Sequence, residues 1–304
     1  MKIHQKAFSF ASPIDQTPLE GTYIYPDAPI GIIQFVHGMA EHQERYFGTM
    51  RSLAQAGYSC VIHNHRGHGN CALFGHFGKG GAEGAIVDTM EVSTLAKKEF
   101  PHLPLYLFGH SMGSLIVRCY LKKDDADLAG VFVCGTPFAP KAIIKAGRAF
   151  VAFKLKINGD AWRSCTVNKM VTGAFNNGIE NPTSPNQWIS YNPENVAAYD
   201  ADERCGFCFT LNGFEALLKL MDETYSPKGW ALKNPTLPIH FLSGEDDPCH
   251  TGIQNFDAAV AMMAAKGYPT TKKLFPQMRH EILLEKESAI VVDHILNVLK
   301  EMAL

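Results

Sequence analysis

The sequence predicts an α/β fold: a mostly parallel sheet flanked by helices, with a helical lid inserted late in the chain. Over the first 136 residues, short apolar or β-branched runs alternate with stretches of helical spacing, which is typical of a parallel sheet covered by helices. From about residue 137 to 232 the alternation stops and helical patterns and loops dominate. We therefore expect one domain over residues 1–304, with a core at 1–136 and 233–304 and the lid at about 137–232.

Six strands are expected in the core. The first, at residues 30–36, is a continuous apolar run, as expected of a strand buried on both faces. The others are short apolar or β-branched runs at residues 58–62, 105–108, 131–134, 239–242 and 271–275. Helical spacing between and after them predicts helices at residues 46–56, 84–100, 114–122, 252–265 and 288–302.

Composition and charge limit the classes of function. Hydrophobic residues make up 46% and charged residues 19% of the chain, as in globular proteins. A formal net charge of −2 gives no electrostatic basis for binding nucleic acid. No apolar run approaches the roughly 18 residues that span a bilayer, and the N-terminus lacks the apolar segment of a signal peptide. We expect a cytoplasmic protein.

The eight cysteines are scattered along the chain and are expected to be reduced thiols. Cys205 and Cys208 form a lone C-x-x-C, a pattern that also occurs in redox-active pairs and in half of a zinc site. No second pair lies at zinc-finger spacing and the flanking sequence is apolar, so buried, reduced thiols are the favoured interpretation.

A G-x-S-x-G motif at residues 109–113 indicates nucleophilic chemistry, with Gly109, His110, Ser111, Met112 and Gly113 in order. An expected strand precedes the motif and an expected helix follows it. On such a tight turn the glycines permit close packing, and the serine hydroxyl stands above the sheet at the positive end of a helix. Ser111 is therefore the predicted nucleophile, with Gly109, His110 and Gly113 supporting its turn.

A serine hydroxyl needs a base to accept its proton, so a carboxylate and then a histidine should follow, each after a later strand. The last expected strand leads into His280. His250 lies on the wrong loop and His294 falls inside the final helix, so neither is a comparable candidate. His280 is the predicted base.

The orienting carboxylate is expected directly after the strand at residues 239–242, where Glu245, Asp246 and Asp247 are adjacent. Asp247 is preferred because it precedes Pro248, whose fixed φ helps to aim the turn. Asp246 stays the alternative, and its non-catalytic role would be to stabilise the turn or cap a helix.

Acyl transfer also requires hydrogen-bond donors for the oxyanion of the tetrahedral intermediate. The backbone N–H of Met112, directly after the nucleophile, is the expected first donor. The second should come from the loop after the first strand, where His37 and Gly38 precede Met39. Gly38 lets the backbone turn sharply, so the N–H of Met39 is the expected second donor, with His37 and Gly38 in support.

Five motifs occur in order along the chain: HGMAEH at 37–42, HRGHG at 65–69, GHSMG at 109–113, GEDDP at 244–248 and RHEILLE at 279–285. Together they resemble the monoacylglycerol lipase and lysophospholipase branch of the α/β-hydrolases over nearly the whole chain. The resemblance implies a carboxylic ester hydrolase, cytoplasmic or at the membrane periphery, with a helical lid over an acyl pocket. It also favours the G-x-x-D aspartate, Asp247. Asn64 departs from the aspartate common in the family.

The histidine-rich loop that contains Asn64 is a further candidate metal site, formed by His63, His65, His68 and Cys71. His63 and His65 share a face only if the strand continues through Asn64. The resemblance instead implies that this loop packs near the active site. We expect no metal here, and the predicted reaction requires neither a metal nor an organic cofactor.

The segment at residues 141–156 contains five basic residues and no acidic ones. Its apolar residues fall at helical spacing opposite Lys141, Lys145 and Arg148. The favoured interpretation is a lid helix that lines a pocket and solvates its basic face. The alternative is a helix at an anionic membrane surface that delivers a lipid substrate.

These predictions describe a serine hydrolase that forms an acyl-enzyme from a lipid-like ester, namely a monoacylglycerol or lysophospholipid. The fold also serves thioesterases, acyltransferases and aminopeptidases, so these activities stay open. A non-catalytic ligand-binding protein is the alternative from another class. An intact serine, aspartate and histidine with both oxyanion elements disfavours it.

Overall fold

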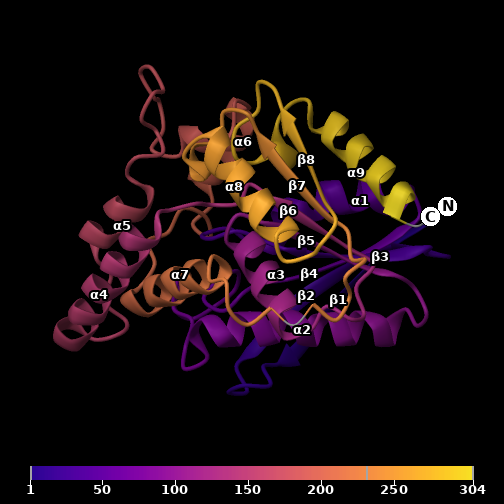
Figure 1. Ribbon diagram of the computed structural model, residues 1–304, viewed down its shortest axis with the longest axis horizontal. Coiled ribbons are helices and arrows are strands. Elements are labelled where there is room, and N and C mark those ends of the chain that lie inside the picture. The colour runs from indigo at the N-terminus through magenta and orange to yellow at the C-terminus, as the bar shows by residue number, and fades with distance from the viewer. Residues whose placement is uncertain (1, 231, 303–304) are drawn as a thin grey trace.

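The computed structural model describes residues 2–230 and 232–302. In the described chain one sheet has the strand order β1-β2-β4-β3-β5-β6-β7-β8 (Figure 1). The six strands from β4 to β8 in this order are parallel, whereas β1 and β2 pair antiparallel. The expected mostly parallel sheet is confirmed. The strands are β1 Ile3–Ala11, β2 Pro18–Pro26, β3 Gly31–Val36, β4 Tyr58–His63, β5 Leu105–His110, β6 Gly130–Cys134, β7 Ile239–Gly244 and β8 Thr270–Phe275.

The hairpin of β1 and β2 has no counterpart in the sequence prediction. β1 is an edge strand whose residues are largely exposed or half-buried, so it lacks a strong apolar signal. Phe8 of β1 lies opposite Gly21 of β2, and a Cβ at Gly21 would lie 2.4 Å from the Phe8 ring. The pairing therefore depends on a glycine, a residue that disfavours a strand when only the sequence is considered.

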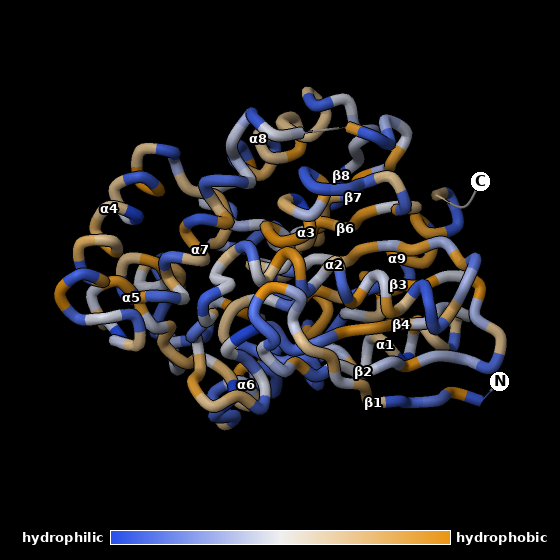
Figure 2. The backbone as a smooth tube through the Cα atoms, turned by 90° about the horizontal axis from the view of Figure 1, so that it is seen from below, coloured by the Kyte–Doolittle hydropathy of each residue, from blue (hydrophilic) through white to orange (hydrophobic). Residues whose placement is uncertain are grey.

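Helices cover both faces of the sheet and bury two hydrophobic cores (Figure 2). In β3, Ile32 and Val36 join one core while Ile33 and Phe35 join the other, as the alternation of a strand requires. The first core is covered by α2 Gly81–Glu99, α3 Met112–Lys123 and α8 Ile253–Ala264, and the second by α1 Phe47–Gln55 and α9 Ser288–Met302. A 3₁₀ turn, η1 Gln43–Tyr46, precedes α1.

The chain between β6 and β7 forms a large helical insertion. Its elements are α4 Lys141–Asn158, α5 Cys165–Thr172, η2 Gln187–Ile189, α6 Pro193–Ala201 and α7 Leu211–Thr224. α7 packs against α2 and α3, and α4 packs on α7. α4 and α5 lie at the end of the molecule farthest from the N-terminal strands (Figure 1). In the described residues, no helix has the length and apolar character needed to cross a bilayer.

Candidate active site

Ser111 lies on the turn that joins β5 to α3. Its backbone has φ 53° and ψ −119°, a region that non-glycine residues rarely adopt. Its N–H donates to the carbonyl of Cys134 in the neighbouring β6, at 2.9 Å. A Cβ at Gly113 would lie 1.9 Å from Val36 O, and one at Gly109 would lie 2.5 Å from Gly113 O. The packing around the strained serine thus requires a glycine on each side.

His280 and Asp247 form a hydrogen-bonded pair in the interior. Nδ1 of His280 donates to Asp247, with both carboxylate oxygens at 3.0 Å, which leaves Nε2 as the basic nitrogen. Asp247 also accepts from Ser243 Oγ at 3.1 Å and from Cys249 N at 2.8 Å. Burial alone would raise the pKa of Asp247, but the charge and hydrogen bond of His280 outweigh burial and lower it to about 2.

The other acidic and histidine candidates lie elsewhere. Asp246 is exposed, and its carboxylate accepts from Tyr191 OH at 3.0 Å. His250 follows Asp247 in the short turn η3 Pro248–His250, whereas His294 lies in α9 and bonds to His240 at 2.8 Å. Of the three carboxylates at residues 245–247, the structure brings Asp247 against the ring of His280.

The loop after β3 passes next to the nucleophile. Gly38 N donates to Glu41 Oε1 at 2.6 Å, and a Cβ at Gly38 would lie 3.1 Å from the Cβ of Ser111. Met39 and Met112 both line the cavity at Ser111. Among the described residues, no acceptor bonds to the N–H of Met39 or Met112.

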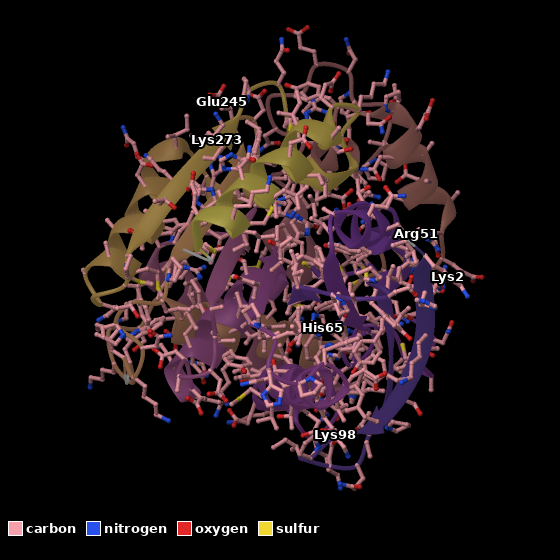
Figure 3. The ribbon with its side chains drawn as sticks, turned by 90° about the vertical axis from the view of Figure 1, so that its right-hand side faces the viewer. Lys2, Arg51, His65, Lys98, Glu245 and Lys273 are labelled. Atoms are coloured by element: carbon pink, nitrogen blue, oxygen red, sulfur yellow. The ribbon has the colours of Figure 1, made fainter. Side chains whose placement is uncertain are left out.

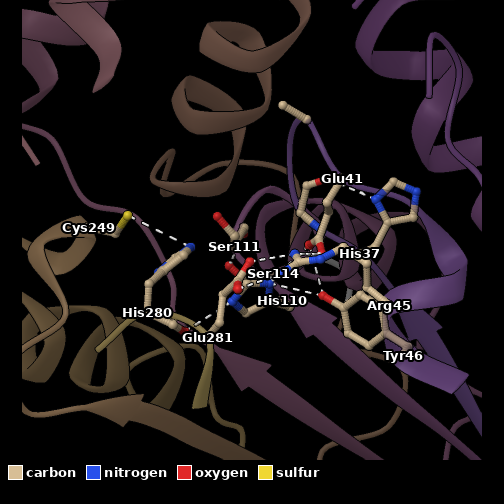
Figure 4. A network of polar contacts seen from close by, with 12 residues as sticks. His37, Glu41, Arg45, Tyr46, His110, Ser111, Ser114, Cys249, His280 and Glu281 are labelled. Carbon is tan, nitrogen blue, oxygen red and sulfur yellow. Dashed lines mark hydrogen bonds and ion pairs between the residues drawn. The ribbon is translucent and has the colours of Figure 1, made fainter. Parts of the chain in front are cut away.

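A buried ionic network that the sequence analysis missed lies behind this loop (Figure 4). Arg45 donates to Glu41 Oε2 at 2.9 Å and to both oxygens of Glu281 at 2.6 and 2.7 Å. His110 contacts Glu41 at 3.3 Å and donates to His280 O at 3.2 Å. Burial alone would lower the pKa of His110, but the hydrogen bond and charge of Glu41 outweigh burial and raise it. Glu41 and Glu281 both belong to the motifs HGMAEH and RHEILLE. Their place in these motifs was the one sequence feature that could have indicated a role near the active site.

Cys249 and Trp188 are further contacts of the histidine that the sequence did not indicate. The thiol of Cys249 lies 3.9 Å from His280 Nε2 (Figure 4). The ring of Trp188, from the insertion, lies 5.0 Å from the His280 ring. Neither contact has a sequence signal, because each joins residues that are far apart in the chain.

Backbone and side-chain bonds fix the segment around His280 to the insertion. These bonds join residues 279–285 to residues 187–190: Arg279 Nη1 donates to Gln187 O (2.7 Å), Glu281 N to Ile189 O (2.8 Å), and Ser190 Oγ to Glu285 Oε2 (2.6 Å). His280 therefore lies between two residues that are each bonded to this part of the insertion.

Four buried histidines pack together beneath the loop of Met39: His37, His63, His65 and His68. His68 Nε2 accepts from Ala40 N at 3.1 Å, and His37 Nε2 accepts from His65 N at 3.1 Å. His65 lies in the middle of the view in Figure 3, whereas Lys2 and Lys98 lie at its outline. His37, His65 and His68 thus support the loop as neutral hydrogen-bonding groups.

Burial lowers the pKa of all four rings, to about 3 for His63 and about 4 for His68. In the unfolded chain they would titrate near pH 6.5. Below that pH the unfolded state binds protons that the folded state does not, so stability falls as the pH falls from about 6.5 toward 4.

His63→Leu is expected to weaken this acid sensitivity. Both ring nitrogens of His63 lack a hydrogen-bond partner among the described residues, so an apolar side chain of similar size removes no bond. The slope of unfolding free energy against pH between 6 and 4 should fall by about 1.4 kcal/mol per pH unit, one proton's worth. Urea unfolding at pH 6, 5 and 4 measures it. The exposed His102, replaced by Asn, is the control, and equal slopes in wild type and His63→Leu would contradict the prediction.

In the described residues, two groups of potential metal ligands converge within 4.8 Å. One is Asp247, Cys249 and His280 of the candidate active site, and the other combines His42 with residues of the insertion. His63, His65, His68 and Cys71 do not form such a group.

Two cavities meet at Ser111. One, of about 250 Å³, is apolar and is walled by side chains of α4, α5 and α7, with Met39, Met112 and Cys249 at its base. The other, of about 190 Å³, contains His280 and is lined by more polar groups of the loop after β3 and of residues 168–207. Trp188 lines both cavities. A bound molecule with an apolar and a polar end could therefore place its junction at Ser111.

This strand order, with a serine on a strained turn between β5 and α3, defines the α/β-hydrolase class. The family model described as serine aminopeptidase, S33, matches residues 27–287, so the chain belongs to this hydrolase family.

Comparison with known proteins gives the same class. A monoacylglycerol lipase of Mycolicibacterium smegmatis is 25% identical over 278 residues, which are 89% of this chain and 88% of that protein. A thermostable carboxyl esterase from Bacillus coagulans, solved in complex with glycerol, is 26% identical with a TM-score of 0.91, covering 99% of both chains. A lipase solved in an open form is 22% identical with a TM-score of 0.89, over 99% of both chains, and shows the same fold. The chain is a hydrolase of the class that contains esterases and lipases.

Proposed function

We propose that the protein hydrolyses esters of a long-chain fatty acid and a neutral polyol, with Ser111 as nucleophile, His280 as base and Asp247 as its orienting carboxylate. The observation that carries the proposal is the position of Ser111 where an apolar and a polar cavity meet. A monoacylglycerol has this division, with its ester bond between an acyl chain and a glycerol group.

In the proposed reaction Ser111 Oγ attacks the ester carbonyl carbon while His280 Nε2 accepts the hydroxyl proton. The N–H groups of Met39 and Met112 bind the oxyanion of the tetrahedral intermediate. His280 then protonates the leaving alcohol, which yields the acyl-enzyme. Water, deprotonated by His280, repeats the attack and frees the acid and Ser111. The bond from His280 Nδ1 to Asp247 supports these steps, because it holds the tautomer whose Nε2 accepts protons.

The polar cavity favours an uncharged leaving alcohol. Among the described residues that line it, none is lysine or arginine, so the phosphate of a lysophospholipid would lack an ammonium or guanidinium partner. Asn168, Thr172 and Asn186 offer neutral amide and hydroxyl groups instead. Glu41 and Glu281 also line it, and they already share the guanidinium of Arg45, so this ion pair offers no free cation to a phosphate. We therefore favour monoacylglycerol over lysophospholipid.

The same two carboxylates bear on the aminopeptidase alternative. An aminopeptidase would need a free carboxylate to bind the substrate's ammonium group, but Glu41 and Glu281 are already paired with Arg45. We therefore expect no appreciable cleavage of amino-acid p-nitroanilides.

The test is release of fatty acid from 1-monooleoylglycerol and from oleoyl lysophosphatidic acid. We expect kcat/KM to be higher for the neutral ester by about 100-fold, which corresponds to a few kcal/mol for a missing charge partner. Equal rates would remove the argument from the cavity lining. Failure to hydrolyse either lipid or any p-nitrophenyl ester would favour a ligand-binding protein.

Gly147→Leu is expected to shorten the preferred acyl chain. Gly147 lies in α4 and lines the apolar cavity, and a Cβ there would lie 3.4 Å from Leu218, an ordinary contact. Leucine should therefore fill the cavity while improving helix propensity by about 1 kcal/mol. We expect kcat/KM for p-nitrophenyl palmitate to fall by about 10- to 100-fold and that for the acetate to stay within about twofold.

Gly147→Ala is the matched control for this substitution, since it gives the same helix benefit with little added volume. It should keep the chain-length profile of the wild type. A parallel loss for short and long esters in Gly147→Leu would show that the cavity does not hold the acyl chain.

We propose further that α4 and α5 form a lid that contacts an anionic lipid surface. Ile143, Phe153, Ile157 and Met170 are each about 60% exposed, and Lys145 and Lys156 lie exposed among them. Exposed apolar side chains beside lysines are the pattern of a helix that lies in a membrane interface.

Vesicle flotation tests the membrane proposal. The wild type should float with vesicles that contain a third anionic phosphatidylglycerol, and Phe153→Asp should reduce the bound fraction by about tenfold. Ile290→Asp, at an exposed apolar position on α9, is the control. Absence of binding at any lipid composition would remove the proposal.

A further inference from the structure

The loop after β3 and the end of α6 bring together three side chains that the proposed reaction does not use. His42, Asp202 and Cys205 offer an imidazole nitrogen, a carboxylate oxygen and a thiol sulfur, all within 4.8 Å of one another. His42 and Cys205 are buried, and Asp202 is partly exposed. These are the three kinds of donor that zinc takes in proteins.

His42 has an unused ring nitrogen in this arrangement. Its Nε2 lies 2.9 Å from Asp202 Oδ2, whereas its buried Nδ1 has no hydrogen-bond partner among the described residues. Nδ1 faces Glu44 Oε2 at 3.9 Å. Metal-bound histidines usually donate their other N–H to a carboxylate, and Glu44 is a nearby carboxylate, although 3.9 Å is longer than a hydrogen bond. A cation at Nε2 would place the proton on Nδ1, and a shift of the exposed Glu44 side chain by about 1 Å would give Nδ1 its partner.

The charge around the three side chains suits a divalent cation. Four carboxylates, of Glu41, Glu44, Asp202 and Glu281, are linked to only two guanidinium groups, of Arg45 and Arg204. His110 also contacts Glu41 at 3.3 Å, so the excess is two negative charges when His110 is neutral and one when it is protonated. Arg204 bonds to both oxygens of Asp202: Nε and the backbone N–H donate to Oδ1, and Nη2 donates to Oδ2 at 3.1 Å. Oδ2 also faces His42. On cation binding Oδ2 would exchange its bond from Arg204 Nη2 for the metal, while Oδ1 stays with Arg204.

We propose that His42, Asp202 and Cys205 form a binding site for Zn²⁺ or a similar divalent cation, separate from the residues of the proposed ester hydrolysis. His42 Nε2, Asp202 Oδ2 and Cys205 Sγ are the protein ligands, and water completes the coordination. The thiol proton of Cys205 leaves to solvent when the sulfur binds the cation. Asp202 also lines an open hollow on the surface, which gives the cation an access route.

The site joins the loop of Met39 to the insertion. Ala40 O already accepts from Gly206 N and from Tyr199 OH, both at 2.9 Å. A cation on His42 and Cys205 would reinforce this contact between segments about 160 residues apart in the chain. We therefore expect Zn²⁺ to raise the melting temperature of the folded protein.

Cobalt absorption tests the site directly, because Co²⁺ occupies zinc sites and shows a thiolate charge-transfer band when sulfur is bound. Metal-free full-length protein is titrated with Co²⁺. We expect the band in the wild type and its loss in Cys205→Ser, with retention in Cys208→Ser, which removes the other thiol of the same C-x-x-C. His42→Asn should weaken Co²⁺ binding by tenfold or more, and Zn²⁺ should displace Co²⁺.

Cys249→Ser tests whether Co²⁺ binds instead at the other group of converging ligands, formed by Asp247, Cys249 and His280. A band that Cys249→Ser abolishes and Cys205→Ser preserves would assign the cation to the proposed active site and overturn the proposal. Absence of the band in the wild type with excess Co²⁺ would also overturn it. Should Cys205→Ser not fold, the weakened binding in His42→Asn and the melting temperature of the wild type with and without Zn²⁺ decide the question.

Discussion

Ser111→Ala is expected to lower kcat/KM for p-nitrophenyl butyrate by roughly 10⁴- to 10⁶-fold, the largest effect of any single substitution in this chain. Alanine removes the attacking oxygen and leaves the turn intact, since the strain lies in the backbone of residue 111 and not in its hydroxyl. The residual rate would come from oxyanion binding and substrate orientation alone. Steady-state kinetics on the p-nitrophenyl series, from acetate to palmitate, measures the loss.

Covalent labelling by a fluorophosphonate probe supplies the control for Ser111→Ala. Ser114 lies one turn further along α3, where its hydroxyl bonds to Ser111 O at 2.5 Å and to Thr136 at 2.8 Å. Ser114→Ala should keep its labelling, whereas Ser111→Ala should lose it. Undiminished labelling of Ser111→Ala would assign the nucleophile to another residue.

Asp247→Asn is expected to lower kcat by about 10⁴-fold. An amide in place of the carboxylate can donate to His280 Nδ1, which favours the tautomer with the proton on Nε2, where it cannot accept the serine proton. The asparagine also removes the charge that stabilises the protonated histidine. KM should change little, because Asp247 is buried behind His280 and does not line either cavity.

Asp246→Asn is the matched control, because it makes the same chemical change one residue away. In the wild type the carboxylate of Asp246 is exposed and bonds to Tyr191. We therefore expect the activity of Asp246→Asn to stay within about threefold of the wild type. Equal losses in the two variants would mean that the turn, rather than a specific carboxylate, limits activity.

Much of the core could be predicted because its signals are local. A buried parallel strand such as β3 is a continuous apolar run, and the turn at Ser111 requires glycines at fixed positions. The side chains of Asp247 and His280 each follow a strand of a parallel sheet. The carboxyl ends of such strands meet at one edge, so their proximity follows from strand order alone.

The features that the sequence did not predict depend on contacts between distant segments. Arg45 and Glu281 are 236 residues apart, and the sequence around each of them does not indicate that the two side chains form an ion pair. Cys205 could be interpreted only beside Cys208, its neighbour in sequence, although the structure brings it to His42. The edge strand β1 was missed because its residues are all exposed or half-buried and so carry little apolar pattern.

Residues 187–190 of the insertion bond to the segment around His280, whereas the described residues 141–172 do not. The two parts of the insertion can therefore be exchanged with different consequences. A chimera that replaces residues 141–172, which include α4 and α5, with those of a relative would exchange much of the wall of the apolar cavity and leave the support of His280 untouched. A chimera that replaces the whole of residues 137–232 would also exchange the partners of Arg279, Glu281 and Glu285. Under the proposed function, the smaller graft is therefore expected to transfer acyl-chain preference, together with the contribution of Asn168 and Thr172 to the polar cavity.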